Sequence, residues 1–131
     1  MGFEDNGNGN MRIQRIEDLE VFKKAHKITL SVYQYTQNFP AAERFGIVSQ
    51  LRRAASSICA NLAEGAGRGT RKELRHFAQI SKGSSREVEY FLKLAVDLGF
   101  LGKREGAEMI SDLSAIQKML YRLIQTLSTE S

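Results

Sequence analysis

The chain has 131 residues, of which 42% are hydrophobic and 26% are charged, as expected for one soluble domain. It has no run of about 18 apolar residues, which disfavours a membrane-spanning helix, and its single cysteine, Cys59, excludes an internal disulfide. Two histidines, His26 and His76, are too few for a zinc cluster, so we expect no metal and no cofactor. The excess of 19 basic over 15 acidic residues gives a formal charge of +4, which favours anionic partners.

The N-terminal residues predict a flexible tail. Residues 1–10 are rich in glycine and asparagine and show no apolar period, and the N-terminus lacks the pattern of an export signal. We therefore expect a flexible tail over residues 1–15, a single domain over residues 16–131, no strand, and a cytoplasmic location.

The first half of the domain predicts two helices, because apolar residues recur there at steps of three and four. The first helix runs from Asp18 to about Asn38. Pro40 disfavours helix at the residue before it and suits the first turn of the next helix, which runs to about Glu64. We expect the glycine-rich residues 65–69 to stop this second helix.

The second half predicts two more helices. Thr70 and Glu73 have the spacing of a capping box and open a third helix, which Gly99 closes. A fourth helix runs from about Lys103 to Leu127 and carries two neighbouring apolar stripes. So wide an apolar face indicates either a subunit interface, which we favour, or a central position in the bundle.

These elements predict an all-α fold, an up-down-up-down antiparallel four-helix bundle with helices about 30 to 40 Å long. On the second helix, a row of polar residues lies beside the apolar face. It consists of Gln50, Ser57, Asn61 and Glu64, with Arg53. Such a row is typical of a hydrogen-bonded seam between helices or subunits, or of a ligand site, and the seam is favoured.

Basic residues are concentrated between residues 44 and 75. Seven basic residues stand there against two acidic ones, so this window carries +5 and the rest of the chain −1. Because arginine can grip phosphate through two bonds, we expect phosphate contacts without base specificity. The candidate nucleic-acid-binding residues are Arg52, Arg53, Arg68, Arg71, Lys72 and Arg75. The alternative is a solvated basic face that pairs with acidic residues of a neighbouring chain.

No arrangement of residues predicts catalysis. Ser56 and Ser57 lack a histidine and an acid at a recognisable spacing, and Cys59 lies on the apolar side of its helix. We therefore expect no catalytic residue, no enzyme activity and no small-molecule substrate.

Several motifs carry a family resemblance: EDLEVFKKA at 17–25, FPAAERFG at 39–46, SQLRRAASSI at 49–58, NLAEG at 61–65 and FAQISKGS at 77–84. In this order they resemble the four-helix bundle proteins encoded in intervening sequences of bacterial 23S ribosomal RNA genes, and the likeness covers roughly residues 17–101. More distantly, the chain is similar to the accessory bundle protein of diversity-generating retroelements.

The resemblance implies a ring-like homopentamer associated with ribosomal RNA or with intervening-sequence RNA. Five copies would multiply the charge of +4 to about +20, enough for salt-sensitive attraction to phosphate. The second hypothesis is a protein–protein scaffold or accessory subunit whose arginines are used in subunit contacts.

Overall fold

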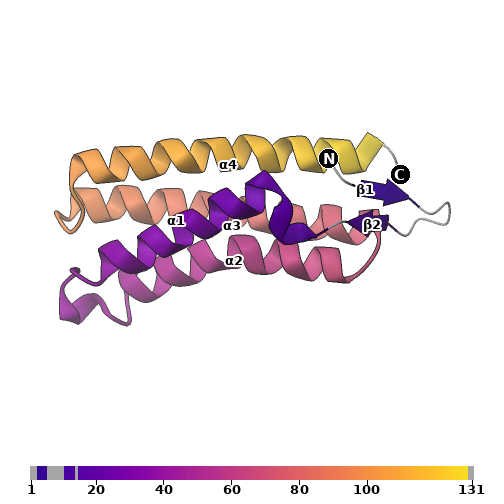
Figure 1. Cartoon of the computed structure of the whole chain (residues 1–131). Coiled ribbons are helices and arrows are strands. Elements are labelled where there is room, and N and C mark those ends of the chain that lie inside the picture. The colour runs from indigo at the N-terminus through magenta and orange to yellow at the C-terminus, as the bar shows by residue number, and fades with distance from the viewer. Residues whose placement is uncertain (1–2, 6–10, 14, 130–131) are drawn as a thin grey trace.

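The computed structural model describes residues 3–5, 11–13 and 15–129. Four long helices run alternately up and down the molecule (Figure 1). They are α1 (Glu20–Thr36), α2 (Ile47–Gly67), α3 (Arg71–Asp97) and α4 (Lys103–Thr129). Two short 3-10 helices, η1 (Ile16–Asp18) and η2 (Ala41–Glu43), precede α1 and α2. The predicted antiparallel four-helix bundle is therefore confirmed for residues 15–129.

Part of the predicted tail has regular structure. Strand β1 (Phe3–Asp5) pairs antiparallel with β2 (Met11–Ile13), with Phe3 opposite Ile13. This pair corrects the expectation of no strand, and it is too short to show an alternating apolar pattern in the sequence. The rest of the predicted tail, residues 1–2, 6–10 and 14, lies outside the described residues.

The helix ends follow the local sequence, with two corrections. The second helix begins at Ile47 and not at Pro40, which is followed instead by the short 3-10 helix η2. The Thr70 side chain accepts a hydrogen bond from the Glu73 backbone N–H at 3.1 Å, and Gly99 has a φ of 79° just beyond the end of α3. The second helix does not stop at Glu64 but continues to Gly67, and the turn to α3 is made at Gly69, where φ is 82°. Among the glycines of residues 65–69, only Gly69 has the left-handed backbone that favours glycine.

Gly65 has a different role, because α2 and α3 approach each other closely at this residue. A Cβ at Gly65 would be 2.8 Å from the Phe77 Cβ and 3.1 Å from the Leu74 Cα. A few residues further into the interface, the buried Ser81 hydroxyl on α3 donates to the Ile58 carbonyl on α2 at 2.8 Å. Small residues thus allow α2 and α3 to make the most extensive contact between any two helices in the described chain.

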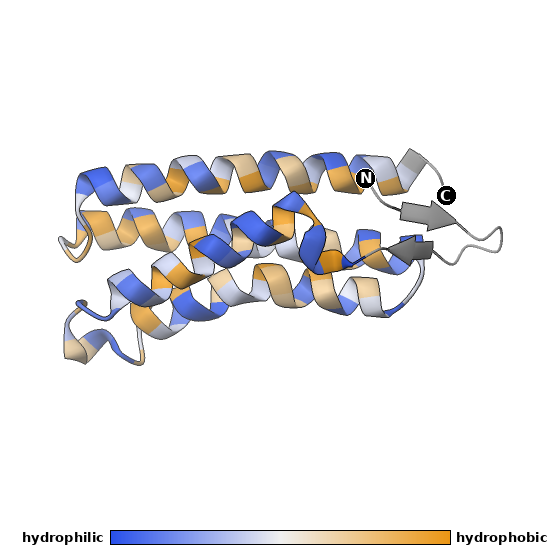
Figure 2. Cartoon of the chain, in the orientation of Figure 1, coloured by the Kyte–Doolittle hydropathy of each residue, from blue (hydrophilic) through white to orange (hydrophobic). Residues whose placement is uncertain are grey.

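The core runs along the inside of all four helices. Figure 2 shows hydrophobic and hydrophilic residues alternating along each helix, as amphipathic packing requires. On α4 both predicted apolar stripes contribute: Leu113, Ile116, Leu120 and Leu123 are buried within the single chain. The width of this apolar face is therefore explained by packing inside the bundle and gives no support for a subunit interface.

Candidate nucleic-acid interface

The bundle separates the basic window into two groups. Arg52 and Arg53 lie near the start of α2, whereas Arg68, Lys72 and Arg75 surround the turn from α2 to α3. Sixteen residues of helix separate Arg52 from Arg68, which is about 24 Å at 1.5 Å per residue. The six candidates therefore do not form one continuous patch.

The α2–α3 turn group consists of Arg68, Lys72 and Arg75. These residues line an open hollow of about 500 Å³ together with Glu73, His76, Phe77 and Gln79. The Arg68 guanidinium donates to the Glu64 carboxylate at 2.8 Å and lies 5.2 Å from the centre of the Phe77 ring. The hydrogen bond that Arg68 donates to Glu64 raises the pKa of Arg68 and holds the charged group at the rim of the hollow.

Arg71 corrects the prediction for this group. Its residue exposure is 4%, so it cannot serve as a surface contact to phosphate. The helical period explains this position, because Arg71 lies three residues before the buried Leu74 and seven before the buried Ala78.

The two arginines at the other end make contacts within the chain. Arg52 donates from Nε to the Thr36 hydroxyl at 2.8 Å, and its guanidinium lies 4.6 Å from the centre of the Tyr33 ring. Arg53 is exposed and donates to the Gln50 side chain at 2.8 Å. Arg52 therefore ties α2 to α1, and Arg53 is the candidate here that faces solvent.

The polar row does not join two helices of one chain. Gln50 and Glu64 are exposed, while Ser57 and Asn61 are half-buried on the same side of α2. Ser57 donates to the Ala54 carbonyl and Asn61 to the Ser57 carbonyl, both at 2.8 Å and both within α2. A contact between subunits stays a prediction for this row.

Of the groups considered for catalysis, Cys59 is half-buried between helices and His76 lies on the surface. The Cys59 thiol donates to the Phe22 carbonyl at 3.4 Å, and burial raises the pKa of Cys59 from 9.0 to about 11. His76 is exposed and meets the Phe77 ring edge-on, with 5.2 Å between ring centres. Within the described residues, no three His, Cys, Asp or Glu side chains are grouped to hold a metal ion.

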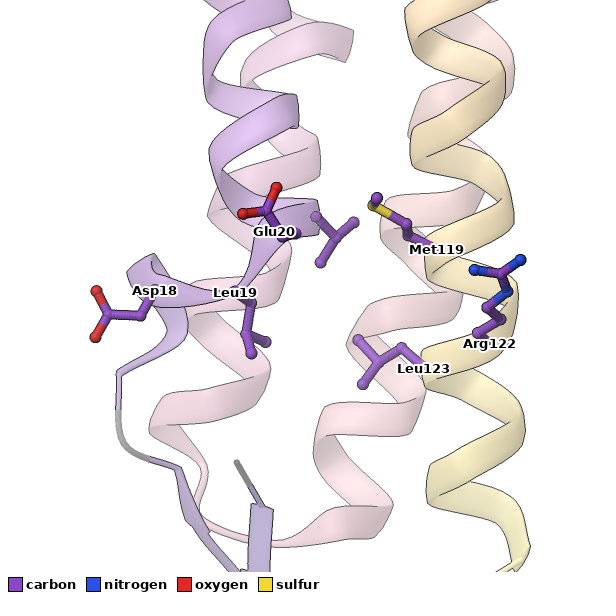
Figure 3. A pocket seen from close by; sticks show the side chains of 7 residues that line it. Asp18, Leu19, Glu20, Met119, Arg122 and Leu123 are labelled. Atoms are coloured by element: carbon purple, nitrogen blue, oxygen red, sulfur yellow. The ribbon is translucent and has the colours of Figure 1, made fainter. Parts of the chain in front are cut away.

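An apolar hollow of about 370 Å³ lies between the start of α1 and α4. Figure 3 shows Leu19, Met119 and Leu123 facing the gap between the two helices, while the Asp18 carboxylate points away from it. α1 and α4 make the least extensive contact of the adjacent helix pairs, which explains the space. Its lining offers no converging polar groups for a specific ligand.

A second set of cations lies outside the predicted basic window of residues 44–75. Lys82 and Arg86 on α3 line a groove with Lys118 and Arg122 on α4. The sequence does contain a pattern that indicates this set, because the spacing Lys-x-x-x-Arg occurs at both 82–86 and 118–122. The acidic residues elsewhere in the chain cancel these cations in any count of net charge.

Comparisons with known proteins place this geometry in a family. A fold neighbour is the crystal structure of a protein of unknown function from the S23 ribosomal protein family of Bacteroides thetaiotaomicron VPI-5482. The two share 22% identity and a TM-score of 0.71, over 79% of this chain and 97% of that one. The search of curated proteins finds no match. No helix in the described part of the chain is long and apolar enough to cross a membrane. The sequence profile of the 23S rRNA-intervening sequence proteins matches residues 17–122, and the chain therefore belongs to this family.

Proposed function

We propose that this protein is a non-catalytic, RNA-associated bundle that assembles as a homopentamer and binds phosphate groups of structured RNA. The observation that carries the proposal is the α2–α3 turn group, in which Arg68, Lys72 and Arg75 line one open hollow. Membership of a family named for 23S rRNA intervening sequences supports RNA as the polyanion.

The contacts at this hollow suit phosphate binding without base recognition. Arg68 is held between Glu64 and Phe77, so its planar guanidinium is oriented before any ligand arrives. Lys72 is exposed and Arg75 is half-buried on the same side of α3. Each cation that neutralises a phosphate releases counterions, which makes binding steeply dependent on salt.

The test is filter binding of a structured ribosomal RNA fragment to the full chain at about 50 and 200 mM salt. The variant Arg68→Ala/Lys72→Ala/Arg75→Ala is expected to bind about ten- to hundredfold more weakly. Its plot of log affinity against log salt should be shallower by about 2 to 3, since three phosphate contacts are lost.

The matched control is Lys23→Ala/Lys24→Ala/Lys27→Ala, which removes the same charge from exposed positions on α1. The control should bind within about threefold of the wild type, because distant exposed charges are screened. Absence of wild-type binding at low salt, or equal binding by the turn variant and the wild type, would contradict the proposal.

Exposed apolar side chains support assembly into an oligomer. Phe45, on the connection to α2, is 90% exposed, and Leu30 and Tyr33 are exposed one turn apart on α1. Large apolar groups in water favour contact with another surface. The test is light scattering after size exclusion, where five copies of the 14.7 kDa chain would give about 74 kDa. A mass of one chain would refute the assembly.

Phe45 also favours a second candidate function, a scaffold that docks a protein partner. The Arg44 guanidinium lies 5.9 Å from the centre of the Phe45 ring, which gives this site an apolar centre and a basic edge. The variant Phe45→Ser separates the two roles. A fall in mass would place Phe45 in the subunit contact, whereas an unchanged mass would leave Phe45 available to a partner and support the scaffold.

A further inference from the structure

A groove between α3 and α4 carries four cations that lie outside the window of residues 44–75. Lys82 and Arg86 come from α3, and Lys118 and Arg122 come from α4. The groove is open and has a volume of about 540 Å³. Its other lining residues are Ser114, Gln117 and Tyr121, so no carboxylate lines it.

The four cations face one another because of helix geometry. On each helix the lysine and the arginine are four residues apart and therefore lie on the same side. α3 and α4 are antiparallel, and the Lys82 ammonium lies 5.2 Å from the centre of the Tyr121 ring. This contact puts Arg122 at the level of Lys82 and Lys118 at the level of Arg86.

Little negative charge relieves the repulsion within this set. Among the described residues, Arg86 forms an ion pair with Glu89 at 3.3 Å, and the Glu89 carboxylate also accepts hydrogen bonds from Lys93 and Gln117. Like charges four residues apart on a helix repel each other. By contrast, the hollow lined by the α2–α3 turn group also contains the carboxylate of Glu73, and Arg68 in that group is paired with Glu64.

The groove is continuous with the α2–α3 turn group along one side of α3. Lys72, Arg75, Lys82 and Arg86 fall within an arc of about 80° at 100° per residue. They span 14 residues, or about 21 Å. Gly83, beside Lys82, has no heavy atom within 4 Å of where its Cβ would be, so the surface is open at that point.

We propose that the α3–α4 groove binds phosphate groups of the RNA chain, so that the RNA-contacting surface extends along α3 from the turn to the groove. This inference rests on the proposed function and adds a second contact region to it. The cations are spread over a length of helix and do not converge on one point, which fits a chain of phosphates better than a single small anion. Tyr121 is exposed and adds a ring on which a base can stack.

The experiment measures binding of a fluorescein-labelled RNA hairpin to the full chain by anisotropy at about 50 and 200 mM salt. The groove variant is Lys82→Ala/Lys118→Ala/Arg122→Ala, which keeps Arg86 because it pairs with Glu89. It is compared with the turn variant and with the α1 lysine control described above, each of which removes three positive charges. Circular dichroism checks that every variant keeps its helices.

The groove variant is expected to bind about ten- to hundredfold more weakly, with a salt slope shallower by about 2 to 3. The variant Lys82→Arg/Lys118→Arg keeps the charge and should bind within about threefold of the wild type. If the groove variant binds the hairpin as tightly as the α1 control does, the groove proposal is overturned. In that case, weaker hairpin binding by the turn variant would still support the proposed function.

Two further outcomes count against the inference in different ways. Absence of hairpin binding by the wild type at low salt removes the proposed function and the groove proposal together. Inorganic tripolyphosphate is titrated in parallel. The assignment to RNA would be overturned if the groove variant lost binding of tripolyphosphate but bound the hairpin as well as the wild type does.

Discussion

The close approach of α2 to α3 at Gly65 predicts opposite effects for two chemically identical substitutions. In Gly65→Ala, the new Cβ would lie 2.8 Å from the Phe77 Cβ and 3.1 Å from the Leu74 Cα. Neither atom can move away by a side-chain rotation, so the two helices must separate. In Gly83→Ala, the new Cβ meets nothing within 4 Å.

The magnitudes follow from two terms. Replacing glycine by alanine inside a helix stabilises it by about 0.5 to 1 kcal/mol. Overpacking a close interface costs about 1 to 3 kcal/mol. Gly83→Ala has the first term alone, whereas Gly65→Ala has both. We therefore expect Gly83→Ala to stabilise the protein by about 0.5 to 1 kcal/mol and Gly65→Ala to destabilise it by up to about 2.5 kcal/mol.

The assay is urea unfolding followed by circular dichroism at one protein concentration, because the apparent stability of an oligomer depends on concentration. Gly67→Ala is a useful companion, since it lies two residues from Gly65 and its Cβ also meets nothing within 4 Å. Gly65→Ala at least as stable as the wild type would refute the argument that this glycine is required for helix contact. Destabilisation by Gly83→Ala would refute the argument from open space.

Three further predictions concern single side chains. Thr70→Ala removes the hydrogen bond to the Glu73 N–H and should lower the free energy of unfolding by about 0.5 to 2 kcal/mol in the same urea assay. The Cys59 thiol, whose pKa burial raises to about 11, should react with iodoacetamide at pH 8 far more slowly in folded than in urea-unfolded protein, and equal rates would contradict its burial. Hydrogen bonds from Gln117 and Lys93 lower the pKa of Glu89 from 4.5 to about 2. The stabilisation by ionised Glu89 is present above about pH 4.5 and is lost as the pH falls toward 2, so Glu89→Gln should destabilise by about 1 kcal/mol at pH 7 and by less at pH 3 in thermal melts.

Local spacing was enough to predict the four helices and the cap at Thr70. The prediction that Arg71 contacts phosphate was wrong, although the position follows the same helical period as the buried Leu74 and Ala78. Counting charge along the chain concealed this, because a count does not distinguish the inner side of a helix from the outer side. The same count missed the groove, because acidic residues elsewhere in the sequence cancel its cations in the total charge.

The sequence by itself determined which residues form helices and which side of each helix is apolar, because both depend on neighbours within a few positions. Only the tertiary structure decided that the second apolar stripe of α4 is buried in the chain and that Arg52 is held by α1. It also brought Lys82 within 5.2 Å of the Tyr121 ring, across 39 positions of sequence. Such neighbours depend on how packed helices are rotated and shifted relative to each other. All the contacts along a helix interface together determine this rotation and shift.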